Sequence, residues 1–282
     1  MIAKLKKQLY FFFCFVRTVY KKSKEHGIVY TAGQLAYFFI LSVFPFLIFA
    51  NTLIASLRIS SNTAVSFLAP FLPGKLIAFV SQYLEYINSQ NSRSILSFGI
   101  FLALFSSSKS VRSLKYAFDL AYGVDNPRGF FSQILFSMLF ILIFSLILIA
   151  VTTLVAFGND FIISILSTVN LALKFIDLSS TLKWLTTAAV FFILISILYK
   201  FVPSEKISFR ETVPGTVFTI CTFMILTWLF SVYLNVVVSE AVVYGSVGAV
   251  ILAMLWMYFA GILLVLGAEI NKTFRDISKT DV

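Results

Sequence analysis

The sequence predicts an all-α fold: a polytopic membrane helical bundle with about six transmembrane helices and amphipathic interfacial helices. Hydrophobic residues make up 60% of the 282 residues and charged residues 12%, against ~45–50% and ~25% in typical soluble domains. The uncharged segment 247–268 reaches ~33 Å as a helix, enough to cross a bilayer core. The stretches between apolar segments are shorter than the ~100 residues of a typical independent domain, so we expect no separate catalytic or nucleic-acid-binding module.

Residues 1–30 predict a basic amphipathic arm on the cytoplasmic membrane surface. Leu5, Leu9, Phe12 and Val16 recur at helical spacing and are flanked by Lys and Arg residues, a pattern typical of interfacial helices. His26, the only histidine, has no Cys or acidic cluster at ligand spacing. We therefore expect it to be a solvated interface residue.

Six segments are apolar enough to be membrane spans. Pro45 lies inside the first span and predicts a bend, whereas Pro214 and Gly215 open the fifth helix in its first turn. The second span continues as an amphipathic helix to Gly123, and an apolar stripe within 58–93 predicts a helix on the membrane surface. The predicted spans are residues 31–57, 94–111, 130–157, 182–201, 213–238 and 247–268.

The basic residues predict the orientation of these spans. Of 22 Lys and Arg residues, 17 lie in the arm, the 109–128 loop, the 200–210 loop and the tail 272–282, and five lie on the other side. Because cytoplasmic loops carry the excess of Lys and Arg, both termini are expected in the cytoplasm. Topology accounts for the net charge of +10, so no nucleic acid is expected as a partner. The arm is expected to contact membrane lipids with anionic headgroups.

No metal site, cofactor or catalytic residue is predicted. Cys14 and Cys221 lie in apolar segments without a CxxC motif, and the acidic residues are scattered among loops. Metal-assisted or acid–base chemistry needs such groups clustered.

Small residues predict a packing face on the last span, where another helix can approach closely. Val265, by contrast, is expected to face the lipid. In the first span, we expect the face with Gln34, Tyr37 and Leu41 to turn toward the bundle, with Gln34 making an interhelical hydrogen bond or a substrate contact. The predicted packing residues are Pro45, Gly245, Ala249, Ala253, Ala260 and Gly267, together with Ala32 and Ala36.

Glu269 ends the last span, where an acid is costly unless it is paired and the helix dipole disfavours an anion. We expect Lys272, Lys109 or Arg112 as its partner. A structural ion pair and a role in transport both remain open.

Several segments resemble the YihY/BrkB family of bacterial inner-membrane proteins: residues 35–47 (LAYFFILSVFPFL), 120–124 (LAYGV), 199–215 (YKFVPSEKISFRETVPG) and 244–271. The resemblance implies a six-helix protein of the bacterial cytoplasmic membrane. It also implies a link to envelope biogenesis, since some members are proposed to move lipid-linked material. An old label calls the family a ribonuclease, which the lone histidine and scattered acids argue against.

Three functions follow from these observations. The first is a transporter or flippase-like protein for an envelope-related, lipid-linked or anionic substrate. The second is a non-transporting scaffold or regulator of envelope biogenesis, and the third, a membrane enzyme, lacks visible catalytic residues. Association into homo-oligomers stays open. The substrate-path candidates are Gln34, Tyr37, Asn51, Ser106, Ser108, Lys109, Arg112, Asn235, Glu240, Tyr244, Ser246 and Glu269.

Overall fold

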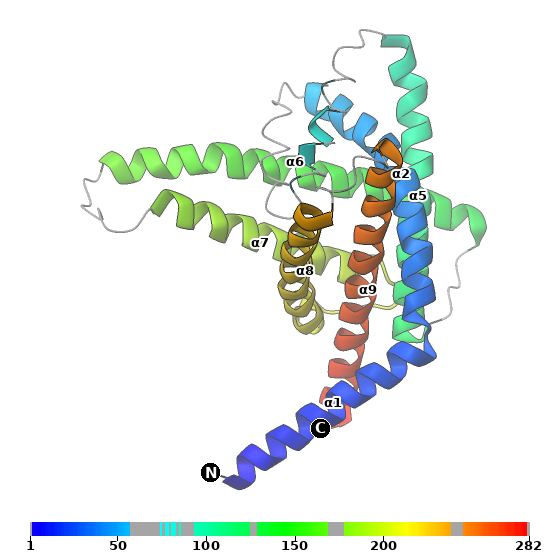
Figure 1. Ribbon diagram of the computed structural model, residues 1–282, viewed down its shortest axis with the longest axis vertical. Helices are drawn as coiled ribbons and strands as arrows, with labels where there is room; N and C mark the ends of the chain where they lie inside the picture. Colours follow the sequence, from blue (N-terminus) through cyan, green and yellow to red (C-terminus); the bar gives the residue numbers. More distant parts are fainter. Residues whose placement is uncertain are drawn as a thin grey trace.

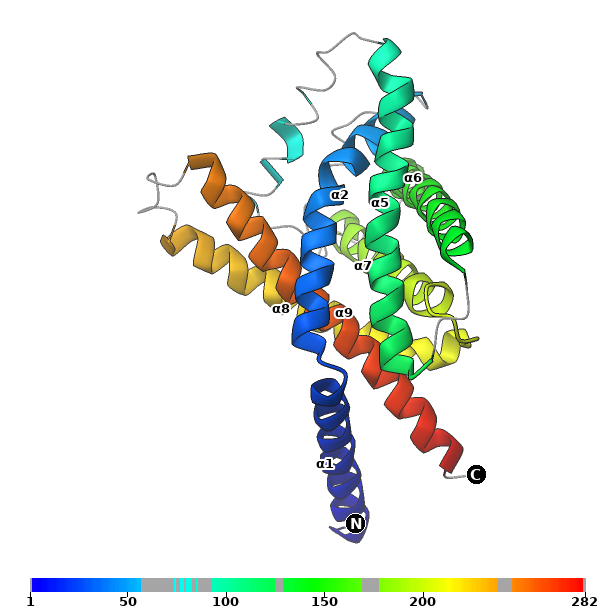
Figure 2. The same ribbon diagram turned by 90° about the vertical axis from the view of Figure 1, so that its right-hand side faces the viewer.

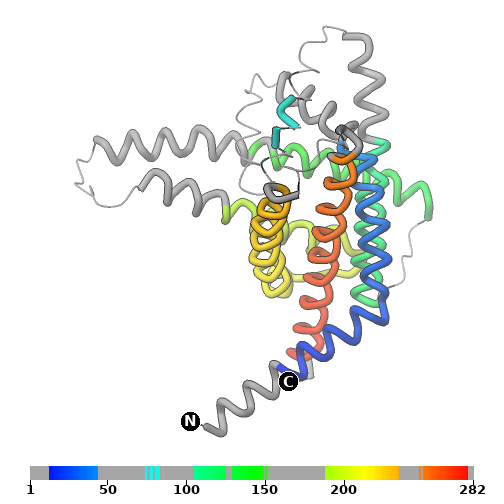
Figure 3. The backbone as a smooth tube through the Cα atoms, in the orientation of Figure 1, coloured from blue at the N-terminus to red at the C-terminus, as the bar shows by residue number. Residues whose placement is uncertain are grey.

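The computed structural model describes residues 2–56, 93–124, 129–168, 178–237 and 245–280, together with residues 74, 77–78, 80–82 and 85. Figure 3 traces the chain and greys the residues whose placement is uncertain. The described part is helical and contains no strand, so the predicted all-α class is confirmed. Its long helices are α1 (Ile2–Glu25), α2 (Ile28–Ser56), α5 (Arg93–Tyr122), α6 (Phe130–Thr168), α7 (Leu178–Phe201), α8 (Phe209–Val237) and α9 (Gly245–Thr280).

Two glycines set helix boundaries at one end of the molecule. Gly27 separates α1 from α2 with a φ of 58°, and Gly123 ends α5 with a φ of 68°. Glycine adopts this left-handed conformation without the steric penalty of a Cβ, which is why it so often follows a helix. The prediction that the second span continues as one helix up to Gly123 is confirmed.

Three of the described helices are long and apolar enough to cross a membrane: Phe130–Leu148, Phe209–Leu234 and Val250–Ser278. The bent pair Phe13–Glu25 and Ile28–Val43 makes a fourth if it is one span. The count of six spans therefore stays a prediction. The expected surface helix in 58–93 lies largely outside the described residues.

Helices α2, α5 and α9 form the centre of the bundle. Helix α9 contacts α2 on one side and α8 on the other, and α2 packs along α5. Helices α6 and α7 run across the direction of these helices (Figure 1). The main core cluster joins α2, α5 and α9 to the end of α7, with Leu35, Phe118, Tyr199 and Val265 among its buried side chains.

On α2 the predicted packing residues Ala32 and Ala36 are buried, but the prediction that Gln34, Tyr37 and Leu41 face the bundle is wrong. Tyr37 is 52% exposed and Gln34 and Leu41 are exposed too, whereas Ala32, Leu35 and Ala36 are buried. The close approach of the two backbones decides which face of α2 packs. A Cβ added to Gly261 of α9 would lie only 3.4 Å from the backbone oxygen of Ala32. The small residues, and not the polar ones, select the face that packs. Helix α2 continues through Pro45, whose side chain is outside the described residues.

Helices α7, α8 and α9 meet at two glycines, Gly215 and Gly267. A Cβ on Gly215 would overlap the backbone oxygen of Gly267, and one on Gly267 would overlap the Tyr199 hydroxyl. The amide of Gly215 donates a hydrogen bond to Asn271 Oδ1 over 2.6 Å. This crossing fixes the amino-terminal end of α8 against α9.

Other predicted packing positions on α9 differ in placement. Ala260 is buried and Ala253 is half-buried, while the side chains at 245 and 249 are outside the described residues. The choice of Val265 as a lipid-facing position is wrong, because it is 2% exposed and belongs to the main core cluster. Helix α9 has neighbours on several sides, so its buried surface is wider than a heptad stripe.

Candidate functional site

Helices α1 and α9, the end of α5 and the loop 202–208 lie at one end of the bundle (Figures 1 and 2). Charged side chains from these segments contact one another there. We call these contacts the charged network. It comprises three groups of residues: Lys115, Asp119 and Ser204; Arg275 and Glu205; and His26, Glu269, Lys22, Asp276 and Lys272.

The first group joins α5 to the loop between α7 and α8. Lys115 Nζ donates to Asp119 Oδ2 over 2.7 Å and also contacts the Ser204 hydroxyl. The Ser204 amide donates to Asp119 Oδ1 over 2.6 Å, and its hydroxyl donates to Oδ2 over 2.9 Å. Both charged residues are buried. A buried ion pair is tolerated when further hydrogen bonds satisfy its oxygens, and Ser204 supplies them.

The second group joins the same loop to α9. Arg275 Nη2 donates to Glu205 Oε1 over 2.5 Å. The guanidinium lies 5.7 Å from the centre of the Tyr122 ring at the end of α5, within the range of a cation–π contact. Arg275 is buried and Glu205 is half-buried. Arg275 of α9 therefore contacts two segments that are distant in the sequence, the end of α5 and the loop 202–208.

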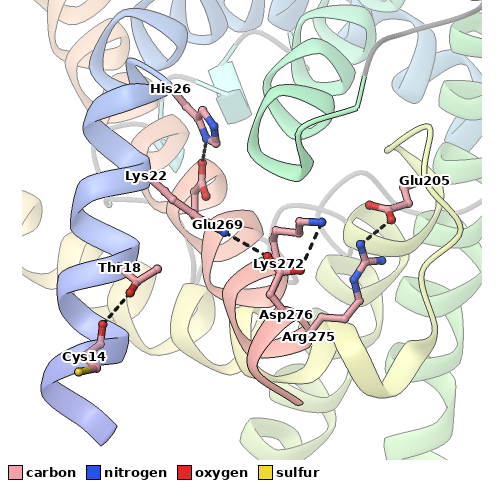
Figure 4. A network of polar contacts seen from close by, with 9 residues as sticks. All are labelled: Cys14, Thr18, Lys22, His26, Glu205, Glu269, Lys272, Arg275 and Asp276. Atoms are coloured by element: carbon pink, nitrogen blue, oxygen red, sulfur yellow. Dashed lines mark hydrogen bonds and ion pairs between the residues drawn. The ribbon is translucent and has the colours of Figure 1, made fainter. Parts of the chain in front are cut away.

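The third group joins α1 to α9, as Figure 4 shows. His26 Nδ1 pairs with Glu269 Oε1, and Glu269 is fully buried. Lys22 Nζ lies 3.1 Å from Asp276 Oδ2, and Lys272 Nζ lies 3.4 Å from Asp276 Oδ1. The expectation that His26 is a solvated residue is wrong, and so is the expected partner of Glu269. No local pattern in the sequence indicates that α1 packs against α9 and places His26 beside this carboxylate.

Several buried atoms of the charged network make no hydrogen bond within the described structure. These atoms are Glu269 Oε2, Glu205 Oε2 and Arg275 Nε. A buried group without a partner is unfavourable by about 1–3 kcal/mol, and more when it is charged. Buried polar groups in folded proteins are as a rule hydrogen-bonded to protein atoms or to ordered water.

The remaining sequence-predicted residues are spread over the molecule. Lys109 is exposed and its ammonium lies 6.0 Å from the Phe105 ring centre, while Arg112 is half-buried. Ser108 is buried and donates to the Phe105 carbonyl over 2.7 Å, and Ser106 is half-buried. Only Glu269 of the candidates belongs to the charged network. The side chains of Asn51, Asn235, Glu240, Tyr244 and Ser246 lie outside the described residues.

Sequence reasoning missed Lys115, Asp119, Glu205 and Arg275 as members of this site. One signal was available: Lys115 and Asp119 are four residues apart and so share a helix face. The two side chains are buried because the loop with Ser204 packs over them. No local pattern in the sequence predicts this contact between distant segments. No group of three His, Cys, Asp or Glu side chains able to hold a metal ion occurs in the described part of the chain.

The helical bundle, its apolar outer surfaces and its charged network at one end define an integral membrane protein of the α-helical class. The sequence model of the family described as "Virulence factor BrkB" matches residues 19–281. The chain belongs to this family, which confirms the resemblance found in the motifs.

Relatives of similar length support the same assignment. A ribonuclease-like protein of Bacillus subtilis, YfkH, is 30% identical over 257 residues, which cover 91% of this chain and 94% of YfkH. A UPF0761 membrane protein of Pseudoalteromonas atlantica is 24% identical over 91% of this chain and 84% of its own length. One from Coxiella burnetii is 23% identical over 90% of each chain. No solved structure matches the chain.

Proposed function

We propose that this protein is a transporter or flippase-like protein of the bacterial cytoplasmic membrane, acting on an envelope-related, lipid-linked or anionic substrate. In this proposal the charged network is the gate that closes the cytoplasmic end of the bundle. The proposal assigns the chain no catalytic step.

One observation carries the proposal: buried charges join four separate segments at one end. Ionisable groups among membrane helices are costly and mark pathways or switching contacts. Transporters alternate by moving one group of helices against another around a fixed site. Ion pairs between segments are suited to this motion, because they can break and form again with water or substrate as the alternative partner.

The distribution of basic residues supports a cytoplasmic location for the gate. The arm, the end of α5, the loop 202–208 and the tail are the segments expected in the cytoplasm from their Lys and Arg content. These same segments contact one another in the charged network. A single topology is therefore compatible with both the charge count and the contacts.

The test is transport by purified protein in liposomes, followed with fluorescent anionic and zwitterionic lipids and with small anions. The matched variant is Glu205→Gln, which keeps the shape of the side chain and weakens its pairing with Arg275. Destabilising the closed state by ~1.4 kcal/mol changes the ratio of open to closed protein about tenfold. We therefore expect the variant to transport on the order of tenfold faster than the wild type.

The control is Glu25→Gln, which removes the same charge from an exposed pair with Lys21 at 3.6 Å. Exposed pairs contribute ~0–1 kcal/mol, so this variant should transport at the wild-type rate. Wild-type protein that moves none of these lipids and anions would contradict the proposal and favour a scaffold or regulator of envelope biogenesis. Equal rates for Glu205→Gln and wild type would refute the gate.

A further inference from the structure

Helix α1 has two faces with different chemistry over residues 13–25, where its side chains are described. It meets α2 at an angle of 63° just after Gly27. An angle of this size lets one helix lie along a membrane surface while the next enters the membrane. Figures 1 and 2 show α1 at the end of the molecule that holds the charged network.

The inner face of α1 is held by α9. Val19 is buried, Lys22 pairs with Asp276, and His26, one residue beyond the helix, pairs with Glu269. These contacts recur at intervals of three to four residues, as one side of a helix requires. The docked face fixes the rotation of α1 about its own axis, and with it the direction of the opposite face.

The outer face carries aromatic and apolar side chains beside basic ones. Phe13, Val16 and Tyr20 are exposed, with Tyr20 at 70%. At 100° per residue they occupy one arc of the helix, and the next arc holds Arg17, Lys21 and Lys24, all exposed. Lys21 is also paired with Glu25 over 3.6 Å, so the outer face keeps a net positive charge.

We propose that this outer face binds anionic phospholipid headgroups of the bilayer. Phe13, Val16 and Tyr20 would be unfavourable in water but suit the boundary between headgroups and acyl chains. Arg17 and Lys21 reach the phosphates from the adjacent arc, as long basic side chains do at interfaces, and attract an anionic leaflet. Lys22, a basic residue of the arm that the sequence predicts to lie on lipid, is instead paired with Asp276 of α9. The inference holds whether or not the protein transports a substrate.

The test uses the full-length protein with Cys221→Ser, so that a fluorescent probe can be attached at the exposed Cys14. The protein is placed in nanodiscs containing equal fractions of phosphatidylcholine and phosphatidylglycerol, with either lipid brominated. We expect brominated phosphatidylglycerol to quench the probe more strongly than brominated phosphatidylcholine. In Arg17→Glu/Lys21→Glu/Lys24→Glu, the ratio of the two quenching efficiencies should fall to about one or below.

The matched control is Lys206→Glu/Arg210→Glu, which reverses two exposed charges outside α1 and should leave the ratio unchanged. A second variant, Phe13→Ser/Tyr20→Ser, should weaken quenching by both lipids while preserving their ratio. Equal quenching by the two lipids in the wild type, or an unchanged ratio in the triple variant, would overturn the inference. The quenching experiment measures no flux, so its outcome is independent of the transport experiment.

Discussion

Gly267→Ala is expected to destabilise the protein by ~3 kcal/mol or more. The added Cβ would overlap the Tyr199 hydroxyl and Thr219 Oγ1. Tyr199 is fully buried and is held by Thr219 at 2.6 Å and by the Leu264 carbonyl at 2.9 Å, so it cannot move aside without losing these bonds. Overpacking costs ~1–3 kcal/mol and each lost hydrogen bond ~0.5–1.5 kcal/mol. Thermal unfolding in detergent measures the loss.

Gly33→Ala is the matched control for this prediction. It adds the same methyl group to a helix, but among the described residues no atom beyond the adjacent backbone of α2 lies within 4 Å of the added Cβ. Alanine is favoured over glycine in helices by ~0.5–1 kcal/mol, so this variant should be as stable as the wild type or slightly more. Equal melting temperatures for Gly267→Ala and the wild type would show that α7, α8 and α9 do not cross as described.

Asp119→Ala is expected to reduce stability by about 3–5 kcal/mol, because it leaves the ammonium of Lys115 buried without its counter-charge. It also removes the acceptor of the Ser204 amide and should loosen the loop 202–208. The double variant Lys115→Met/Asp119→Asn removes both charges and keeps a polar group beside Ser204. We expect it to be more stable than Asp119→Ala despite carrying one more substitution.

Thermal unfolding of the wild type, Lys115→Met, Asp119→Asn and the double variant completes a double-mutant cycle, which isolates the coupling of the pair. A coupling energy near zero would mean that the two side chains do not form a buried pair. Asp119→Ala should also make the loop 202–208 more sensitive to protease. If Asp119→Ala loses stability but its loop is cleaved no faster than in the wild type, Ser204 does not anchor the loop through Asp119.

The sequence predicted the helical class and the approximate start of each long described helix, since apolar runs mark helices locally and Gly123 marks the end of α5. It did not predict that α6 and α9 continue to Thr168 and Thr280, well beyond the predicted ends at 157 and 268. For α2 it did not decide between the face with Gln34 and Tyr37 and the face with the small residues Ala32 and Ala36. Gln34 and Tyr37 are polar groups in a predicted membrane span, yet they lie on the exposed side of α2. Ala32 packs instead, because its size allows α9 to approach.

The candidate site was harder to predict than the fold. An acid at the end of an apolar span predicts that Glu269 has a partner, but that partner, His26, lies 243 residues away in the chain. Likewise, Arg275 and Glu205 belong to two segments that look like ordinary charged ends of membrane helices. Contacts of this kind depend on how helices pack and leave no periodic pattern in one sequence.

The central claim is that the charged network lies on the cytoplasmic side of the membrane, and cysteine labelling tests it most directly. In a background with Cys14→Ser and Cys221→Ser, single cysteines are placed at Lys206, at Ser278 and at Arg93, the last at the opposite end of α5. A membrane-impermeant maleimide is then added to right-side-out and inside-out vesicles.

We predict that Lys206→Cys and Ser278→Cys react in inside-out vesicles and stay unlabelled in right-side-out vesicles, with the reverse pattern for Arg93→Cys. Labelling of Lys206→Cys in right-side-out vesicles as fast as Arg93→Cys would contradict the claim.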